Sequence, residues 1–473
     1  MPSRQDQLHS YQFTVQRVVA ALVMRETDPA QSPFRRVAGA TTAGAIVAVL
    51  ALAGAALYGV FAGGSGNWRT EGQVIIEKGT GTRYVFYKPD DSLHPVINYT
   101  SALLIAGSSA KPTVVTWSQS ALDGARRGAP MGIVGAPDSL PDTKHLVRSE
   151  WTLCSQKSAD GTDPAGKPQS VLLVGDSVTG GQELVPAGRS TQPTALLVST
   201  PDGKRYLVYN KHRYQVTQPT QVLAAFRWAA TSPLPVSPAL VNALPAGPDL
   251  KLLPIPRRGE RSSVLPGAKV GQVYRLANAG QYSVLLADGL ANITKAQSDL
   301  LLADPETPAS SDGQAIDLSA TEYSVAKKSA TGLAAALPFD EAPVLRPTPG
   351  SVCVSISDAQ GVEKVVVDPK LPDSSAAAVT PARTANGGIL ADRIVIPAGH
   401  GVLVEAVSAP GAPGGAVSLV TDRGIRYPLA NRDLAATLGY AGVTPATMPA
   451  ELVALLPAGP ALDPADARQR ASS

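Results

Sequence analysis

The chain has 473 residues and a formal net charge of +3 at pH 7, with a pI of about 8.7. This charge is too mild for the basic patch of a typical nucleic-acid-binding protein. Only 17% of the residues are charged and 5% are aromatic, whereas glycine (43) and proline (41) are abundant. The mixture favours short elements separated by turns over one large parallel sheet, built as two or three domains or as several small modules.

Residues 1–36 predict a short amphipathic helix. Its apolar residues recur at helical spacing and are Tyr11, Val15, Val18, Val19, Leu22 and Val23. We interpret this helix as a docking segment for other subunits, with attachment to the membrane surface as the alternative.

Residues 37–62 predict a transmembrane helix, the segment around which the chain is organised. No residue from Val37 to Trp68 carries a charge, and residues 43–61 are a nearly continuous apolar run. About 20 apolar residues suffice to cross a bilayer as a helix. A helix is also the one conformation in which a single span satisfies its own backbone amides within hydrocarbon.

The charges beside this span predict its orientation. Arg35 and Arg36 abut it, whereas the other flank is neutral until Arg69. Positive charge marks the cytoplasmic end of a span, so we expect a cytoplasmic N-terminus and an extracytoplasmic (periplasmic) bulk on a plasma membrane. The alternative is a signal peptide cleaved near residues 60–62.

Small residues recur along the span. They include Gly44, Ala48, Ala51, Ala55 and Gly59. Small side chains at every fourth position let two helices approach closely, so this face predicts helix–helix packing within the membrane.

Beyond the span, one pattern occurs four times: an apolar run, a turn with glycine, and a second run that opens on tyrosine. The glycine and tyrosine pairs are Gly81 and Tyr84, Gly203 and Tyr206, Gly280 and Tyr282, and Gly424 and Tyr427. The pattern is typical of a β-hairpin, and a helical stretch follows it.

These hairpins predict four small hairpin-plus-helix modules. We place them at residues 70–119, 194–258, 259–337 and 414–465, followed by a tail at 466–473. Modules two and four share the sequence Leu-Pro-Ala-Gly-Pro, at 244–248 and 456–460. A small module buries little apolar surface by itself, so we expect the four copies to dock on another domain.

The remaining segments, 120–193 and 338–413, predict two halves of one β-rich central domain. Each half contains short apolar runs and one of the chain's two cysteines, Cys154 and Cys353. A non-cytoplasmic location permits a disulfide between them, whereas two buried free thiols are the alternative. The expected fold class is therefore α+β, rich in β structure, behind one transmembrane helix.

The sequence offers no catalytic, cofactor-binding or metal-binding motif. The glycine-rich stretches at 79–82 and 175–181 lack the lysine that a phosphate-binding loop requires. The five histidines do not stand at metal-ligand spacing from one another. We therefore expect no cofactor, no metal and no enzymatic activity.

Several stretches together resemble one known family. They are residues 4–29 (RQDQLHSYQFTVQRVVAALVMRETDP), the span after a double arginine, residues 132–141 (GIVGAPDSLP) and residues 151–154 (WTLC). In this order they resemble the EccB family of actinobacterial type VII (ESX) secretion systems, over essentially the whole chain.

The resemblance implies a core subunit of a secretion complex in the membrane. It implies assembly with an FtsK-like motor ATPase (EccC), a polytopic channel-forming subunit (EccD) and a mycosin protease, and self-association into a homo-oligomer. Some members of the family are described as ATPases. A structural scaffold is thus the expected function, and the alternatives are a tethered module that binds peptidoglycan and an extracytoplasmic nucleotide hydrolase.

Overall fold

The computed structural model describes residues 3–25, 33–62, 67–107, 111–148, 150–157, 166–190, 192–277, 279–308, 313–333, 337–373, 377–381 and 383–471. The chain divides into two compact units. The first comprises Met1–Pro95 and Thr113–Ala129, and the second comprises Val96–Pro112 and Pro130–Ser473.

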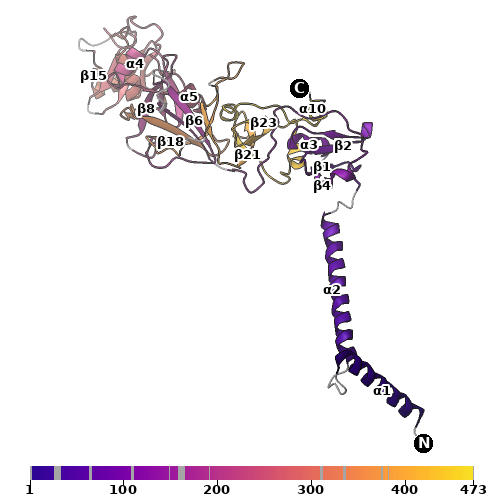
Figure 1. Ribbon diagram of the computed structural model, residues 1–473. Coiled ribbons are helices and arrows are strands. Elements are labelled where there is room, and N and C mark those ends of the chain that lie inside the picture. Colours follow the sequence, from indigo (N-terminus) through magenta and orange to yellow (C-terminus); the bar gives the residue numbers. More distant parts are fainter. Residues whose placement is uncertain are drawn as a thin grey trace. The chain divides into compact units, whose positions relative to one another are not determined.

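Two long helices open the first unit (Figure 1). Helix α1 (Arg4–Met24) begins with a capping box, in which Ser3 and Asp6 each accept a hydrogen bond from the backbone N–H of the other. It ends at Arg25, whose φ of 57° is left-handed. Helix α2 (Pro33–Ala62) has proline as its first residue, a position where the missing N–H costs no helical hydrogen bond.

A four-stranded sheet completes the first unit. Its strands are β1 (Gln73–Lys78), β2 (Arg83–Tyr87), β3 (Ser92–Pro95) and β4 (Thr113–Ser118), in the order β3-β2-β1-β4. Neighbours pair antiparallel except β1 and β4, which are parallel. Ile75, Phe86, Leu93 and Leu122 form its apolar core.

The second unit repeats this strand order three times. The sheets are β10-β9-β8-β11, β14-β13-β12-β15 and β23-β22-β21-β24. In each, three antiparallel strands are followed by a helix and a fourth strand parallel to the first. We call the four sheets modules 1 to 4 in chain order.

The bounds of these elements are as follows. Module 2 contains β8 (Thr194–Ser199), β9 (Arg205–Tyr209), β10 (His212–Val216), α4 (Pro219–Ala225) and β11 (Leu234–Pro235), and β16 (Val344–Leu345) joins β8. Module 3 contains β12 (Val273–Leu276), β13 (Tyr282–Leu286), β14 (Gly289–Ile293), α6 (Lys295–Leu302) and β15 (Ile316–Leu318). Module 4 contains β21 (Gly401–Val407), β22 (Ala416–Thr421), β23 (Arg426–Pro428), α8 (Leu434–Thr437) and β24 (Ala446–Pro449).

A seven-stranded central sheet, in the order β19-β20-β6-β5-β17-β18-β7, lies in the same unit. Its strands are β5 (Trp151–Lys157), β6 (Pro168–Val174), β7 (Gln182–Glu183), β17 (Ser351–Ile356), β18 (Val362–Val367), β19 (Ala378–Val379) and β20 (Arg393–Val395). Strands β5 and β6, from before module 2, lie between the pairs β19–β20 and β17–β18, from after module 3, so neither segment forms the sheet by itself. The short helices α5 (Pro238–Ala243) and α9 (Ala450–Val453) pack together beside it and contribute to the same apolar core.

Three short helices complete the second unit. They are α3 (Tyr99–Ala106), which contacts α8 and α10 (Pro464–Ala467), and α7 (Ala320–Val325), which follows β15.

The structure corrects two of the expected boundaries. Residues 401–407, expected in the central domain, form β21 of module 4, so that module begins well before residue 414. Residues 120–129 belong with module 1, because the backbone of Leu93 on β3 forms hydrogen bonds with the backbones of Arg126 and Gly128. Residues 408–415 separate β21 from β22, and α3 and β4 separate residues 120–129 from β3, so a hairpin pattern reveals neither pairing.

Candidate functional site: a membrane anchor and a disulfide-tied scaffold

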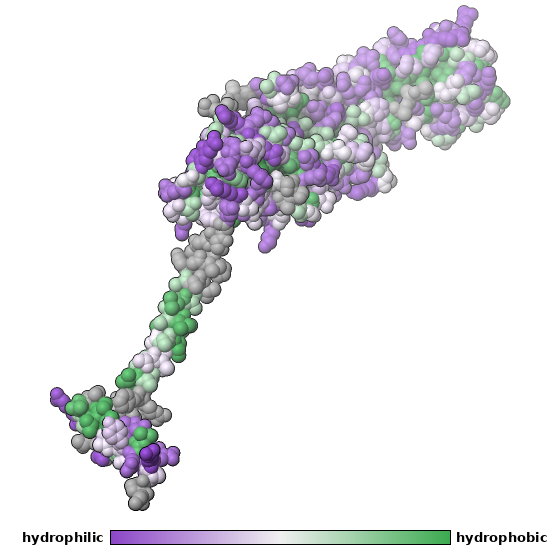
Figure 2. Space-filling view, turned by 90° about the vertical axis from the view of Figure 1, so that its right-hand side faces the viewer, coloured by the Kyte–Doolittle hydropathy of each residue, from purple (hydrophilic) through white to green (hydrophobic). Residues whose placement is uncertain are grey.

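Helix α2 is long and apolar enough to cross a membrane. Its described segment Val37–Ala55 has a mean hydropathy of 1.9 and no buried residue. Figure 2 shows this rod mainly in hydrophobic and neutral colours. The hydroxyls of Thr41 and Thr42 donate to the carbonyls of Val37 (2.9 Å) and Ala38 (2.7 Å), so the helix itself satisfies its polar side chains.

The small-residue face predicted for this helix is solvent-exposed in the isolated chain. Gly44, Ala48, Ala51 and Ala55 are all exposed, and a side chain added at Gly44 would meet no atom within 4 Å. Gly59 lies in α2, but its surroundings are outside the part that the structure describes, as are those of residues 60–62, where the alternative interpretation places a cleavage site.

Helix α1 exposes apolar side chains along its length. Tyr11 is 70% exposed and Leu22 is 78% exposed, with Val15 and Val18 also exposed. Val19 is partly buried, and the side chain of Val23 lies outside the described residues. Exposed apolar residues along one helix need a membrane or a protein to cover them.

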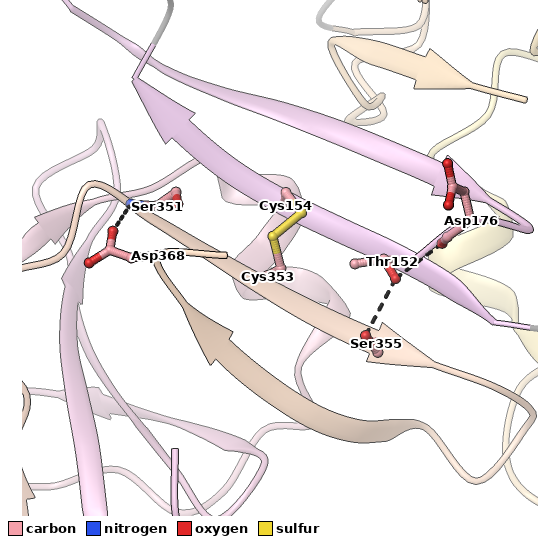
Figure 3. The surroundings of a disulfide bond; sticks show 7 residues. All are labelled: Thr152, Cys154, Asp176, Ser351, Cys353, Ser355 and Asp368. Atoms are coloured by element: carbon pink, nitrogen blue, oxygen red, sulfur yellow. Dashed lines mark hydrogen bonds between the residues drawn. A yellow bond between two sulfur atoms is a disulfide. The ribbon is translucent and has the colours of Figure 1, made fainter. Parts of the chain in front are cut away.

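The disulfide joins Cys154 and Cys353 (Figure 3). The two residues lie directly opposite each other on the neighbouring antiparallel strands β5 and β17, with their Cα atoms 4.0 Å apart. They are 199 residues apart in sequence, so the bond connects the two segments that build the central sheet. The structure thus pairs the two cysteines and leaves no free thiol among its described residues.

Both faces of the central sheet are covered around the disulfide. On one face Cys154 and Cys353 pack with Val171 and Leu173. Leu153, Leu172, Val352 and Val354 belong to the large core that also includes residues of α5 and α9. A sheet covered on both faces buries consecutive residues of its strands, and residues 151–155 of β5 and 170–174 of β6 are all buried.

Polar side chains add further ties to the central sheet. The hydroxyl and backbone N–H of Ser170 donate to Asp392 Oδ2 at 2.6 and 2.7 Å, and the N–H of Asp392 donates to Ser170 Oγ at 3.0 Å. Ser155 Oγ on β5 accepts from the N–H of Ser237, the N-cap of α5, at 2.9 Å. Each tie joins residues that are distant in sequence, so the central sheet is fixed by covalent and hydrogen bonds together.

The glycines predicted at hairpin turns all lie in turns and have positive φ. They are Gly81 (72°), Gly203 (81°), Gly280 (63°) and Gly424 (71°). Tyr84, Tyr206 and Tyr282 lie on the second strand of modules 1 to 3. Tyr427 differs, because it lies on β23, the third strand of module 4. The fourth hairpin is therefore the second hairpin of its module, and Tyr427 corresponds to Tyr214 on β10 rather than to Tyr206.

A short segment pairs alongside the third strand in every module, and we call it the strap. In module 2, the backbone N–H of Arg213 donates to the carbonyl of Pro245 (2.9 Å), and the carbonyl of Arg213 accepts from the N–H of Gly247 (2.8 Å). In module 4, Arg426 makes the same two bonds with Pro457 and Gly459. The same two backbone hydrogen bonds occur in module 1, where Leu93 pairs with Arg126 and Gly128. They occur again in module 3, where Leu290 pairs with Lys327 and Ser329. The shared Leu-Pro-Ala-Gly-Pro sequence is thus the strap of modules 2 and 4.

The strap glycine lies against a ring on the third strand. A Cβ added at Gly247 would overlap Tyr214, one at Gly459 would overlap Tyr427, and one at Gly128 would overlap His94. In module 3 the ring position is occupied by Ala291 and the glycine position by Ser329. Ring and glycine therefore occur together and are replaced together, a relation that the sequence alone did not reveal.

The ring in module 1 is a buried histidine with three polar neighbours. His94 Nδ1 donates to the carbonyl of Ala129 (2.7 Å), and Nε2 lies 2.8 Å from Asp90 Oδ2 and 2.9 Å from Ser92 Oγ. Burial of the Asp90 carboxyl works in the opposite direction, but hydrogen bonds from Ser92 and His94 lower its pKa. This cluster links the third strand to the residue that follows the strap glycine.

The glycine-rich stretches considered as phosphate sites serve as turns. Residues 79–82 connect β1 to β2, and residues 175–181 follow β6. Among the described residues, no group of three or more histidine, cysteine, aspartate or glutamate side chains is arranged to hold a metal ion. The structure does bring His145 and His400 together, with ring centroids 5.0 Å apart, although they are far apart in sequence.

Among the described residues, one helix is apolar and long enough to span a membrane, and sheet modules and a tied central sheet follow it in the chain. This is the architecture of a membrane-anchored protein with a large folded part. Residues 1–472 match the family described as the type VII secretion system ESX-1 transport transmembrane domain B, EccB. The chain belongs to this family.

Relatives with curated names agree along almost the whole chain. The ESX-3 secretion system ATPase EccB3 of Mycolicibacterium smegmatis is 26% identical over 98% of this chain and 89% of its own length. The ESX-1 secretion system ATPase EccB1 of the same species is 29% identical over 96% of this chain and 92% of its own length.

Solved structures share the fold. An EccB3 dimer from the ESX-3 core complex matches 84% of this chain and 99% of its own, with a TM-score of 0.62 and 26% identity. A chain of an intact ESX-5 inner membrane complex matches 100% of this chain and 96% of its own, with a TM-score of 0.66 and 24% identity. These similarities agree with a β-rich ESX membrane component.

Proposed function

We propose that the chain is a structural core subunit of a type VII secretion complex in the plasma membrane. Helix α2 anchors it, helix α1 docks with other subunits on the cytoplasmic side, and the sheet modules and central sheet form an extracytoplasmic scaffold. The observation that carries the proposal is the combination of one apolar helix with a body whose central sheet is built from two distant segments and tied by Cys154–Cys353. Such a body resists partial unfolding and so offers neighbours a fixed surface.

The proposed partners are a further copy of the chain, an FtsK-like motor ATPase, a polytopic channel subunit and a mycosin protease. The solved relatives are an EccB3 dimer and an ESX-5 inner membrane complex, which supports this set. The small-residue face of α2, formed by Gly44, Ala48, Ala51 and Ala55, is suited to close helix contacts in the membrane. Many copies held in one membrane have a high effective concentration, so even weak contacts between their bodies assemble them.

Purification from membranes in mild detergent tests the proposal. A C-terminally tagged chain should carry a motor ATPase and a polytopic membrane protein with it, identified by mass spectrometry. A variant with Gly44 and Ala48 both replaced by leucine should retain less of these proteins, because the larger side chains separate the helices. A matched variant, Ile46→Leu, changes the opposite side of α2 and should retain them. Recovery of the wild-type chain alone would contradict the proposal.

The names of the relatives contain the word ATPase, which makes nucleotide hydrolysis the second candidate. Residues 79–82 and 175–181, its nearest sequence candidates, lie in turns and contain no lysine. Phosphate release by the purified chain, measured before and after removal of any co-purified motor ATPase, separates the two functions. Release that disappears with the motor supports the scaffold, and release that stays with this chain supports hydrolysis.

A further inference from the structure

The four modules differ at one place, the free edge formed by the fourth strand. This strand has six residues in module 1 (β4), but two in module 2 (β11), three in module 3 (β15) and four in module 4 (β24). Each lies at the end of its sheet or strand path. An edge strand presents unpaired N–H and C=O groups that can pair with another chain.

Three of the four edges carry the devices that prevent such pairing. Strand β11 ends in Pro235 and β24 ends in Pro449, and proline cannot donate a ladder hydrogen bond. Strand β15 carries Asp317, which is ion-paired with Arg275 at 2.7 Å. Short strands, prolines and charges are the usual protection of a sheet edge.

Strand β4 carries none of these devices. Its sequence, Thr-Val-Val-Thr-Trp-Ser, has no charge and no proline and consists mainly of residues that favour strands. Val115 and Trp117 pack toward the apolar core, whereas Val114 (43% exposed), Thr116 and Ser118 face solvent. Among the described residues, β4 forms its strand pairing with β1, and no strand pairs on its outer side.

We propose that the outer edge of β4 pairs with β4 of a second copy of this chain, in antiparallel orientation about a two-fold axis. The inference rests on the proposed function, in that it names the surface through which the scaffold associates with itself. Pairing of β4 with itself joins two four-stranded sheets into one of eight strands and satisfies both edges.

The chemistry of β4 favours its own copy as the occupant. A two-fold axis places the strand opposite its own copy, so a charged strand would meet a strand of like charge, and β4 carries no charge. A six-residue edge is far smaller than the surface that a stable dimer of free proteins buries. The pairing therefore depends on the membrane anchor, which precedes module 1 in the chain and holds copies at high effective concentration.

Single cysteines test the pairing in the full-length chain reconstituted in lipid vesicles. The native cysteines are both in the disulfide, so an introduced cysteine is the one free thiol. Val114→Cys, Thr116→Cys and Ser118→Cys are oxidised separately and run on non-reducing gels. In antiparallel two-fold pairing, equivalent residues meet only near the axis and separate by about 7 Å for each residue away from it. We expect at least a fivefold higher dimer yield at the position, or the two positions, nearest the axis than at the position farthest from it.

Two further variants complete the test. Asp317→Cys, on the matching edge of module 3, is the control and should give the lower yield. Adding Val114→Lys to the best cross-linking variant puts like charges into both of the paired strands and should reduce its yield. If Val114→Cys gives the highest yield, Thr116→Lys is added to it in place of Val114→Lys. Circular dichroism verifies that each variant is folded, and a misfolded lysine variant is replaced by glutamate at the same site.

Equal yields at all four positions, or a yield unchanged by the added lysine, would overturn the proposal. The oligomeric state of the wild-type chain in the same vesicles is measured by single-molecule photobleaching. An oligomer whose β4 cysteines do not cross-link contradicts only the β4 assignment. A wild-type monomer contradicts the self-association in the proposed function as well.

Discussion

The contact between a glycine and a ring is the residue-scale feature that repeats along this chain. Gly128, Gly247 and Gly459 each lie so close to a ring that a Cβ would overlap it. Neither Gly247 nor Gly459 has a positive φ, so close packing rather than backbone conformation requires glycine there. The ring covers the strap, and the strap forms the outer hydrogen bonds of the third strand.

Gly247→Ala should therefore lower the free energy of unfolding by roughly 1–3 kcal/mol, the usual cost of overpacking a filled site. Chemical denaturation of the detergent-solubilised chain measures it. The matched control is Gly350→Ala, where an added Cβ would lie 3.5 Å from Asp368 Oδ1 in ordinary contact. Tyr214→Ala removes the ring, so the double variant should recover part of the loss. Additive effects of the two changes would refute the contact.

The Asp90–His94 pair gives module 1 a pH dependence. Hydrogen bonds from Ser92 and His94 hold the pKa of Asp90 below its ordinary value in the folded chain, so its carboxylate stabilises the fold above that ordinary value. This contribution is lost as the pH falls through the lowered folded pKa. Asp90→Asn should increase amide hydrogen exchange of the strap around residues 126–129 at pH 6, by a small factor because Asp90 is exposed. Below the folded pKa of Asp90 the variant and the wild type should exchange alike; a difference that persists there would show that the Asp90 carboxylate is not its cause.

At the scale of elements, the disulfide links the two distant segments that form the central sheet. Strands β5 and β17 are neighbours although two modules separate them along the chain. Without a covalent link, the unfolded chain must close this long loop each time it folds. The disulfide removes part of that entropy from the unfolded state.

Replacing Cys154 and Cys353 together by alanine should lower the free energy of unfolding, with roughly 5 kcal/mol as the upper limit of the chain-entropy account. Guanidinium denaturation with and without a reductant provides the measurement. Reductant should destabilise the wild type and leave the double variant unchanged. An equal midpoint for wild type and variant would mean that the bond contributes nothing to the central sheet.

The sequence predicted local elements better than their assembly. The hairpins around Gly203 and Gly280 could be read because their two strands are adjacent in sequence and a glycine turn separates them. Strand β21 was misplaced because residues 408–415 separate it from β22, which removes the hairpin signal. The misplacement then shifted Tyr427 by one strand. The order of strands in the central sheet, and the contact of strap glycine with ring, depend on pairings across long stretches that periodicity does not encode.

At the scale of the whole molecule, one apolar anchor helix and one scaffold are joined in a single chain. The 37–62 span was predictable because about 20 uncharged residues can have few other roles. The family could be identified from ordered stretches along the chain, and the match over residues 1–472 agrees with it. The orientation of the span rests on Arg35 and Arg36 beside it and is open to direct measurement.

Thiol labelling in right-side-out membrane vesicles tests this arrangement most directly. Ser10→Cys places a thiol on the exposed surface of α1, and Ser357→Cys places one on the exposed turn after β17. An impermeant maleimide should label Ser357→Cys in intact vesicles and Ser10→Cys only after permeabilisation, with both chains in the membrane pellet. Labelling in the reverse order, or a labelled chain released into the soluble fraction, would contradict the account.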